Sequence, residues 1–536
     1  MVFKILRILI LVHVFNGCAE YEADNRPNIL FIMSDDHAYQ ALSAYTDRLI
    51  TTPNIDRISD EGVLFTNACV ANSICAPSRA TILTGKHSHI NGKIDNHSQF
   101  DTNQVTFPKL FQDAGYQTAM YGKLHFGNNP KGVDDFMILP GQGHYINPDF
   151  ITNQGDTTIR GYVTDIITDL VLDWFKNKRN KRKPFLMFYM HKAPHRPWWP
   201  SPEKFSEYSK KTFPIPKTLF DDYRNRGSAA KTAEMNILYD LRYGHDSKIK
   251  PSTINNMEEI QPYVEPYDWG GFDGFTTSFI RTDQIQREQY NVVLDSINLW
   301  FKNNWSSLDY REKMIWKYQR YMQDYLGCIS SVDDNVGRVL DYLDESGLSN
   351  NTIVVYTSDQ GFYLGEHGWF DKRFIYDESF KTPLMIRWPM KIKKGLKRNQ
   401  MVQNLDFAQT FLDAAGIDAL EDMQGESLLP LIIGDIDKWD RDAVYYHYYE
   451  YPSVHMVKRH YGIVTEDYKL AHFYYDVDEW ELYDRTLDPG EMKNLYLDPE
   501  YQDIVSDLKK RLYDLRKKYK DSEKLDRYYI NRYLSN

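Results

Sequence analysis

Cysteine is scarce in this chain. Among 536 residues there are only four, Cys18, Cys69, Cys75 and Cys328. So few cysteines exclude a scaffold held together by disulfides, so a hydrophobic core must stabilise the fold instead. With 42% hydrophobic residues, the chain can form one large domain and a smaller one.

Positive charge is also in deficit. Lys and Arg total 64 against 75 Asp and Glu, which gives a formal net charge of −11. No long basic tract is present, and this argues against binding to nucleic acid. Because the overall field repels anions, an anionic substrate would need a local pocket of cationic residues.

Long apolar runs are also missing. After the N-terminal segment, no stretch of the sequence is long and apolar enough to cross a membrane. The first residues have the pattern of an export signal, with Lys4 and Arg7, an apolar run over 8–15 and then Gly17-Cys18-Ala19. A cysteine at this point resembles the lipidation site of a bacterial lipoprotein; ordinary signal cleavage is the alternative. We expect a signal peptide over residues 1–18 and a mature protein in the periplasm or at the cell surface, anchored to the membrane by a lipid on Cys18.

Four short apolar runs end abruptly in polar residues. The runs cover 28–33, 117–121, 184–190 and 352–357, and the polar residues after them are Asp35-Asp36, Lys123 with His125, His195, and Asp359-Gln360. Such continuous runs are typical of buried parallel strands. Because ligands bind beyond the carboxyl ends of parallel strands, we expect one pocket to collect these groups.

Helical patterns alternate with the strands. Apolar residues between Leu326 and Leu343 largely follow three-to-four spacing, and Gly347 stands where a helix would stop. The alternation predicts an α/β fold over residues 24–400, with helices on both faces of a mostly parallel sheet. Tyr-rich strand segments and a charged helix at 501–520 predict a smaller antiparallel-sheet subdomain over residues 401–536.

The region from about residue 240 to 310 breaks this alternation. It contains Tyr263, Tyr267, Trp269 and Phe272 among several glycines. We expect a long loop or insertion near the mouth of the site. A surface excursion without a role is the simplest interpretation, and contact with substrate is the alternative.

The segment Cys75-Ala76-Pro77-Ser78-Arg79, which continues to Leu83-Thr84-Gly85, is the most informative one. Pro77 and Ser78 suit the first turn of a helix, whose free N–H groups attract anions. Arg79 adds a permanent charge and a planar donor fork that fits an oxyanion. Cys75 is therefore expected at an anion-binding point, although a structural cysteine beside a capped helix would also fit.

This segment resembles the signature of the formylglycine-dependent (type I) sulfatases, in which a maturation enzyme oxidises the cysteine to an aldehyde. The resemblance covers about residues 26–389, with further similarity at Glu481-Leu-Tyr-Asp484 and Asn494-Leu495. Residues 359–369 are most similar to bacterial polysaccharide sulfatases. The resemblance implies an alkaline-phosphatase-like fold, a formylglycine (3-oxoalanine) derived from Cys75 and one Ca²⁺ per chain.

The resemblance also implies a metal site. Its ligands would be Asp35, Asp36, Asp359 and Gln360, together with residue 75. Three carboxylates and a side-chain carbonyl are hard oxygen ligands that suit Ca²⁺. The family more often has Asn or His at the position of Gln360, which still offers a carbonyl oxygen on a longer arm.

The remaining family positions supply the missing positive charge. The catalytic set implied by the resemblance is Cys75, Arg79, Lys123, His125, His195 and Lys372. Ca²⁺ and Arg79 would help to ionise the hydrated aldehyde, and the two lysines would hold the sulfate oxygens. His195 would protonate the leaving oxygen with Lys372 as a helper, and His125 would take the proton that lets the aldehyde re-form.

A sulfated polysaccharide or its oligosaccharides is the expected substrate, because of the export signal, the aromatic content and the local resemblance. Both an algal polysaccharide, such as ulvan or carrageenan, and a glycosaminoglycan fit these features. Candidate sugar-binding residues are Glu366, His367, Arg373, His455 and Arg459, with His460. Each of these could equally be an ordinary surface residue.

Two other functions stay open at this point. One is a formylglycine-dependent phosphodiesterase or phosphonate monoester hydrolase, because these esters resemble sulfate esters in shape. The other is a non-catalytic surface lipoprotein that binds glycan, and the intact segment from Cys75 to Arg79 argues against it.

Overall fold

The structure is a computed structural model that describes residues 25–254 and 274–535. The expected signal peptide with Cys18, and the aromatic residues Tyr263, Tyr267, Trp269 and Phe272, lie outside the described residues. Within the described ranges, no helix has the length and apolar character needed to span a membrane.

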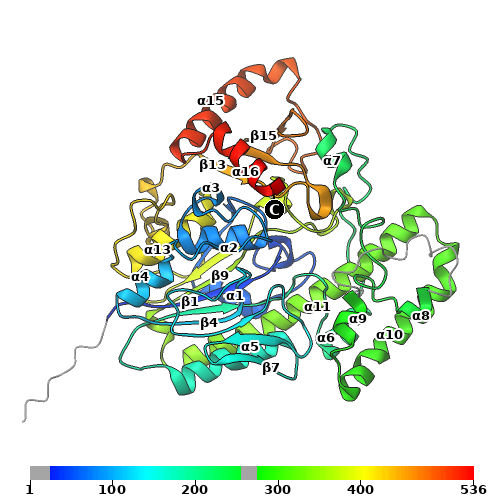
Figure 1. The fold of residues 1–536 in the computed structure, drawn as a ribbon, viewed down its shortest axis with the longest axis horizontal. Coiled ribbons are helices and arrows are strands. Elements are labelled where there is room, and N and C mark those ends of the chain that lie inside the picture. Colours follow the sequence, from blue (N-terminus) through cyan, green and yellow to red (C-terminus); the bar gives the residue numbers. More distant parts are fainter. Residues whose placement is uncertain (1–24, 255–273, 536) are drawn as a thin grey trace, which may run out of the picture.

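A ten-stranded sheet forms the centre of the molecule (Figure 1). Its strands are β1 (Asn28–Ser34), β2 (Val63–Phe65), β4 (Gln117–Lys123), β5 (Asp135–Leu139), β6 (Asp149–Thr152), β7 (Gly155–Thr158), β8 (Phe185–Met190), β9 (Thr352–Ser358), β10 (Leu384–Arg387) and β11 (Leu396–Arg398). They lie in the order β11-β2-β10-β9-β1-β8-β4-β5-β6-β7. The central strands β9, β1, β8, β4 and β5 are mutually parallel, so all four predicted strands are confirmed.

Helices cover both faces of this sheet. On one face lie α1 (Pro53–Asp60), α5 (Val163–Asp173) and α11 (Tyr310–Glu345), and on the other lie α2 (Cys75–Thr84), α4 (Phe107–Asp113) and α13 (Phe407–Ala414). In β1, Leu30 and Ile32 face the first group of helices, whereas Ile29 and Phe31 face the second. Burial on both faces explains why this strand is apolar at nearly every position.

The long helix α11 extends the helix predicted from the spacing between Leu326 and Leu343. It begins at a capping box, in which Asp309 accepts from the backbone of Glu312 and the Glu312 side chain accepts from the backbone of Asp309. It ends just before Gly347, which has a φ of 71°. The helix packs against α1, α5 and α6 (Pro202–Tyr208).

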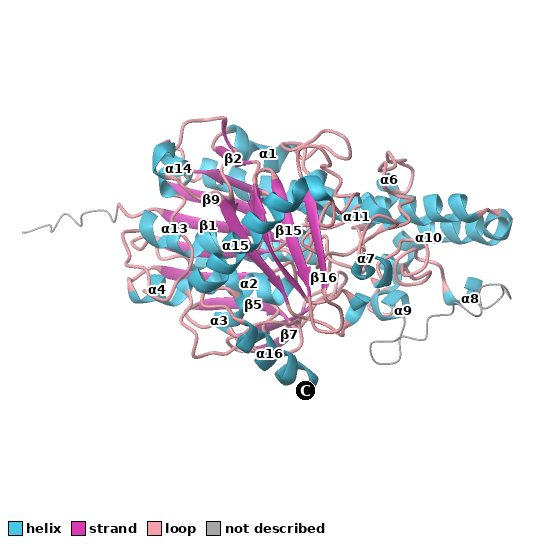
Figure 2. Cartoon of the chain, turned by 90° about the horizontal axis from the view of Figure 1, so that it is seen from above, coloured by secondary structure: helices cyan, strands magenta, loops and turns pink. Residues whose placement is uncertain are grey.

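A second, four-stranded antiparallel sheet follows, as predicted. It contains β13 (Ala443–Tyr448), β14 (His460–Thr465), β15 (Tyr468–Phe473) and β16 (Glu479–Asp484) in that order. One face packs on the main body through Tyr446 and Phe473, and the other packs on α15 (Gln502–Lys518). Figure 2 shows α15 lying across these strands. A last helix, α16 (Glu523–Ser535), was not predicted.

The expectation of a long loop at 240–310 is wrong over its second half, where α10 (Gln284–Asn304) forms a 21-residue helix, whereas an insertion, the other form of that expectation, stays a prediction. Asp283 and Gln286 make a capping box at its start, a pattern that the sequence carries in plain form. The short elements α8 (Pro251–Ile254) and α9 (Gly274–Phe279) precede it. The remaining named elements are α3 (Ser88–Asn91), α7 (Ser228–Thr232), α12 (Asp377–Phe380), α14 (Leu429–Ile433), β3 (Ala68–Cys69) and β12 (Val402–Gln403).

Candidate active site

Two neighbouring parallel strands bring three carboxylates together. In the register of β1 and β9, Ser34 lies opposite Ser358, so Asp35, Asp36 and Asp359 leave the sheet at one level. Carboxylate oxygens of these three residues lie within 4.8 Å of one another. Asp36 has a left-handed φ of 64°, and its N–H donates to Asp359 Oδ1 at 3.0 Å. The hydrogen bond to Asp359 therefore helps to hold Asp36 in this left-handed conformation.

The carboxylate group has the character of a cation site. All three side chains are buried, and burial together with repulsion from Asp35 and Asp359 raises the pKa of Asp36 to about 7, although Lys372 opposes this. Among the described residues, no hydrogen-bond donor reaches Asp35 Oδ1, Asp36 Oδ2 or Gln360 Oε1, whereas Asp35 Oδ2 contacts Lys123 and Arg79. Carboxylate and amide oxygens without donors are the ligands that a hard divalent cation such as Ca²⁺ prefers.

Cys75 begins helix α2 beside this group. Its sulfur, an oxygen of Asp35 and a ring nitrogen of His195 lie within 4.8 Å of one another. Burial raises the pKa of the Cys75 thiol, even though Lys372 and Lys123 act in the opposite direction. An unmodified Cys75 would therefore stay a neutral thiol and a poor nucleophile.

Arg79 lies one turn further along α2 and binds the carboxylates. Its Nε and Nη2 atoms both lie 2.9 Å from Asp359 Oδ2, and Nη2 lies 3.4 Å from Asp35 Oδ2. Its Nη1 atom donates to the backbone oxygen of Lys123. The guanidinium thus connects the ends of three strands and fixes the carboxylates relative to α2.

Two buried lysines border the same space. Lys123, the last residue of β4, contacts Asp35 and donates to Gln142 Oε1 at 2.5 Å. Lys372 Nζ donates to Asp36 Oδ1 at 2.6 Å, and the amide nitrogen of Gln360 contacts the same oxygen. The acidic chain therefore does carry a local group of cations.

Two histidines complete the predicted catalytic set. His195 Nε2 lies 3.8 Å from Asp36 Oδ2, and its Nδ1 hydrogen-bonds to the backbone oxygen of Arg196 at 2.5 Å. His125 has a φ of 64°, and its buried Nδ1 has no hydrogen-bond partner among the residues described. Burial, followed by repulsion from the charge of Lys123, holds the pKa of both histidines well below the usual value, so both rings are neutral.

Candidate sugar-binding residues from both sheets meet next to Lys372. Arg373 Nε donates to Asp371 Oδ1 at 2.9 Å, and Arg373 Nη1 donates to Glu450 Oε1 at 3.0 Å. His455 Nε2 lies 3.3 Å from Asp371 Oδ2. Asp371 and Arg373 have left-handed φ angles of 74° and 94°, which directs both side chains around Lys372.

The other candidates are held within the protein. His367 is fully buried and its Nδ1 accepts from Arg226 Nη1 at 2.8 Å. His460 accepts from the N–H of Ile375 at 3.1 Å and donates to the oxygen of Lys458 at 2.7 Å. His460 thus has both ring nitrogens hydrogen-bonded, whereas His367 Nε2 lies 3.7 Å from Glu378 Oε2 and has no hydrogen-bond partner among the described residues. The burial of both rings favours structural roles over contact with a sugar.

Glu366 and Arg459 also lie away from the carboxylates and lysines. Glu366 accepts from the N–H of Leu364 at 2.6 Å, and burial followed by repulsion from Glu378 raises its pKa to about 7. The fully buried Arg459 donates to the oxygen of Tyr451 at 2.9 Å. Neither contact reaches the group around Cys75.

Several polar residues of the site were not predicted. They are Asn96, Gln142, Lys192, Asp371 and Glu450. Lys192 follows β8 and lies 4.8 Å from the ring centre of Tyr145, and burial, followed by repulsion from Lys123, lowers its pKa to about 7. The position of Lys192 just after a buried strand could have predicted its place in the site. The other four residues lie in loops, where no such signal exists.

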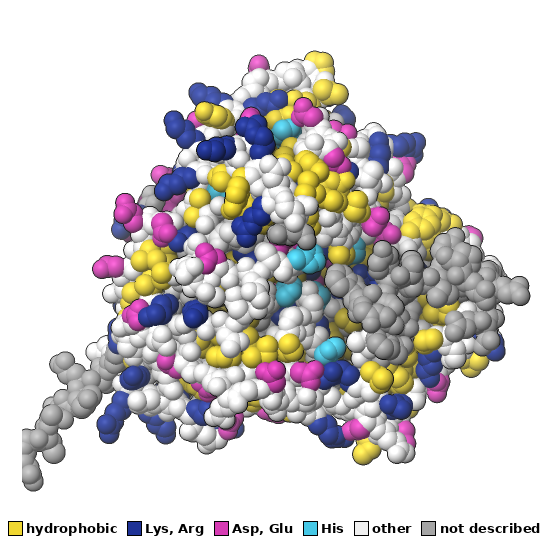
Figure 3. All heavy atoms as spheres, viewed as in Figure 1, with side chains coloured by type: hydrophobic (Ala, Val, Ile, Leu, Met, Phe, Trp, Pro, Cys, Tyr) yellow, Lys and Arg dark blue, Asp and Glu magenta, His cyan; other side chains and the backbone are white. Residues whose placement is uncertain are grey.

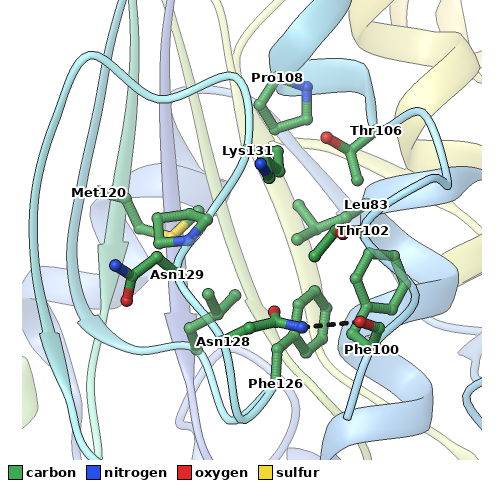
Figure 4. A pocket seen from close by; sticks show the side chains of 12 residues that line it. Leu83, Phe100, Thr102, Thr106, Pro108, Met120, Phe126, Asn128, Asn129 and Lys131 are labelled. Atoms are coloured by element: carbon green, nitrogen blue, oxygen red, sulfur yellow. Dashed lines mark hydrogen bonds between the residues drawn. The ribbon is translucent and has the colours of Figure 1, made fainter.

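Two cavities in the described part of the chain lie outside this site. Histidine side chains gather in the middle of the face seen in Figure 3. A cleft of about 310 Å³ is lined by Arg160, Gln286 and Tyr290 among others, and a pocket of about 20 Å³, shown in Figure 4, is lined mainly by apolar side chains such as Leu83 and Phe126. Neither lining includes a predicted catalytic residue.

Comparison with known proteins gives consistent matches over the whole fold. A family model described as sulfatase matches residues 27–417, and one described as N-sulphoglucosamine sulphohydrolase, C-terminal, matches residues 365–518. A Bacteroides thetaiotaomicron protein named N-acetylglucosamine-6-O-sulfatase is 45% identical over 521 residues, covering 95% of this chain and 89% of that protein.

Solved structures agree with these matches. One, described as a complex with its substrate D-glucosamine-2-N,6-O-disulfate, has a TM-score of 0.86 and 46% identity, covering 93% of this chain and 99% of the other. A phosphonate monoester hydrolase from Silicibacter pomeroyi has a TM-score of 0.64 at 19% identity, covering 92% and 96%. The second likeness extends to the fold alone, which is mostly parallel and alkaline-phosphatase-like.

Proposed function

This chain is a member of the sulfatase family, and we propose that it removes the 6-O-sulfate group from glucosamine units of glycosaminoglycan-type saccharides. The observation that carries the proposal is the likeness, over nearly the whole chain, to a protein named N-acetylglucosamine-6-O-sulfatase and to a structure bound to a 6-O-sulfated glucosamine. Among the substrates expected from the sequence, this favours glycosaminoglycan over ulvan or carrageenan.

Formylglycine at position 75 and one Ca²⁺ are part of the proposal. Asp35, Asp36, Asp359 and Gln360 would hold the cation, since Asp35, Asp36 and Gln360 each keep an oxygen without a hydrogen-bond donor and the three carboxylates lie within 4.8 Å of one another. Ca²⁺ would supply Lewis-acid polarisation of a sulfate oxygen, and the hydrated aldehyde would supply an oxygen nucleophile together with a second hydroxyl for releasing sulfate. The raised pKa of the Cys75 thiol supports a modified residue over a thiolate.

Lys123 and Lys372 bind the sulfate group in this proposal. Each now contacts a carboxylate of the cation site, Asp35 or Asp36. A cation on those carboxylates would leave the ammonium groups available for sulfate oxygens. Arg79 keeps its contacts to Asp359 and fixes the helix that carries residue 75.

The two histidines divide the proton transfers. His125 is neutral and has a free ring nitrogen, so it suits the base that takes a proton from residue 75. His195 must be protonated to act as the acid, because its Nδ1 already donates to Arg196. The negative charge of an arriving sulfate ester favours that protonated ring.

Sugar hydroxyls would bind at Asp371, Arg373 and His455. These side chains already hydrogen-bond or pair with one another next to Lys372. A carboxylate beside a guanidinium offers both an acceptor and donors, which is what a pair of hydroxyl groups requires. The export signal, the lipid on Cys18, the location outside the cytoplasm and the maturation enzyme stay predictions.

The test is sulfate release from defined substrates by the purified, matured enzyme. We expect the highest kcat/KM for glucosamine 6-O-sulfates, with an N-acetyl or N-sulfate group, and much lower values for sugars sulfated only at N-2 or O-3. Faster hydrolysis of another sulfate position would overturn the substrate, and faster hydrolysis of a phosphodiester or phosphonate monoester would overturn the activity itself.

A further inference from the structure

Glu450 lies between the candidate sugar-binding side and the helix that carries the nucleophile. It follows β13 in the second sheet and is 1% exposed. Oε1 accepts from Arg373 Nη1 at 3.0 Å and from Ser453 Oγ at 3.2 Å. Oε2 accepts from the backbone N–H of Asn96 at 2.6 Å. The carboxylate therefore uses both oxygens on different parts of the site.

Asn96 continues the contact to residue 75. Its Oδ1 accepts from the N–H of Ala76 at 3.0 Å. The residue before α2, Ile74, has no side-chain oxygen with which to cap the helix, so Asn96 satisfies one of the open N–H groups of the first turn. Glu450 thus holds the loop that caps the turn containing Cys75.

Hydrogen bonds within the loop around Asn96 restrain its backbone. Asp95 Oδ1 accepts from the N–H groups of His97 and Ser98, at 2.9 and 2.6 Å. Lys93 contacts the backbone oxygen of Ser98 from the other side. These contacts tie Asn96, which caps the N-terminus of α2, to the rest of the loop.

We propose that Glu450 is a positioning residue that couples sugar binding at Arg373 to the placement of residue 75. The inference rests on the proposed function, since it assigns Arg373 to the sugar. One carboxylate oxygen sets the direction of the guanidinium, and the other sets the helix turn that holds the nucleophile. A sulfate ester without a sugar uses only the second restraint.

Glu450→Gln separates the two restraints when activity is measured on a sulfated glucosamine and on 4-nitrophenyl sulfate. The variant loses the charge that orients Arg373, so KM for the sugar should rise, while kcat should fall on both substrates. We expect the ratio of kcat/KM for sugar to that for aryl sulfate to fall roughly tenfold, as for loss of one charge-assisted hydrogen bond. Glu481→Gln is the matched control, because Glu481 is equally buried in the same sheet and bonds to Tyr376 and Gly227.

Two further variants assign the effect to its route. In an Arg373→Ala background, Glu450→Gln should lower the ratio no further, since its partner is gone. Asn96→Ala keeps the N–H that Glu450 binds but removes the cap, so kcat should fall several-fold on both substrates with the ratio unchanged. Asn96→Asp keeps an acceptor at the cap and should restore most of the rate.

The proposal is overturned if Glu450→Gln changes the ratio no more than Glu481→Gln, if its effect on the ratio persists in the Arg373→Ala background, or if Asn96→Ala leaves kcat unchanged. The sugar used is whichever sulfated glucosamine the wild-type enzyme hydrolyses fastest. A preference for a position other than O-6 therefore counts against the proposed substrate and leaves the test of Glu450 intact.

Discussion

Two buried groups of ligand-type side chains in this protein differ in how their polar atoms are used. Asp35, Asp36 and Asp359 form one group, and His447, Asp521 and Asp526 form the other; in each, three potential ligand atoms lie within 4.8 Å of one another. Distance alone would mark both as metal sites.

Hydrogen bonding separates the two. His447 Nδ1 lies 2.9 Å from Asp521 Oδ2, and its Nε2 lies 2.7 Å from Tyr474 Oη. Arg516 Nη2 donates to Asp526 Oδ2 at 2.7 Å, and within this group, which lies wholly in the described part of the chain, only Asp526 Oδ1 lacks a partner. The histidine has no free nitrogen, and an arginine already supplies the positive charge.

The difference distinguishes a candidate cation site from a group of side chains with a structural role. The first group keeps two carboxylate oxygens without hydrogen-bond donors, Asp35 Oδ1 and Asp36 Oδ2, at the end of β1. The second keeps one, Asp526 Oδ1, and its other contacts tie β13 to α16 and to the segment before α16. Several carboxylate oxygens without donors around one point indicate a ligand, whereas a group whose histidine nitrogens and arginine are paired internally indicates a structural role.

The largest expected effect comes from the residue beside the first group. Cys75→Ala should lower kcat at least about 10⁴-fold, the scale of losing a covalent nucleophile, while the melting temperature changes little. Sulfate release and thermal unfolding of the purified variant measure the two quantities. Retained turnover would refute the proposed chemistry.

Calcium should stabilise the protein through the first group only. At a concentration 100 times its Kd, a cation that binds the folded state adds about 2.7 kcal/mol to the free energy of unfolding. We expect Asp36→Asn to lose most of this gain, and Asp521→Asn to keep it. Thermal unfolding with Ca²⁺ or chelator tests this, and an equal gain in both variants would remove the distinction.

The second group should matter for stability and little for rate. Asp521→Asn removes the negative charge that lies 2.9 Å from His447 Nδ1 and 3.7 Å from Arg516 Nε, while Arg516 keeps its contact to Asp526. The change should cost about 3 kcal/mol in the free energy of unfolding, with kcat changed less than about twofold. Denaturant unfolding gives the first value. The exposed Asp507→Asn serves as the control, and a cost no larger than for that variant would contradict the interpretation.

The smallest effect concerns His460, another buried ring with both nitrogens bonded. Burial lowers its pKa to about 3, whereas an unfolded histidine has a pKa of about 6.5. Between these values the unfolded chain binds a proton that the folded chain does not, so stability falls as the pH falls. His460→Gln should make the dependence of unfolding free energy on pH shallower, by up to about 1.4 kcal/mol per pH unit. An unchanged slope would show that His460 does not contribute.

The sequence predicts the strand-end groups well because the signal is local. Apolar runs mark β1, β4, β8 and β9, and parallel strands must end at one edge, so Asp35, Lys123, His195 and Asp359 could be placed together before any coordinates were known. The wide separation of these residues along the chain did not matter, since topology brings them together.

Other parts of the site could not be predicted in this way. Glu450 and Asn96 are 354 residues apart, and their contact depends on how the second sheet packs on the first. His367 was a candidate because it lies in the segment that resembles bacterial polysaccharide sulfatases, and His460 because it lies in the second subdomain, but neither position reveals that the ring is buried. Hydrophobic periodicity predicts which face of a helix or strand is buried, but not which residues its side chains contact.

The burial of Cys75 has a consequence for how the active protein is made. With no surface exposed at this residue, an enzyme that oxidises it would have to act on the chain before it closes. Any molecule that folds before this oxidation would have the native structure but would stay permanently inactive. The specific activity of a preparation would then depend on the fraction of chains oxidised before they fold, and not on how well the protein is folded.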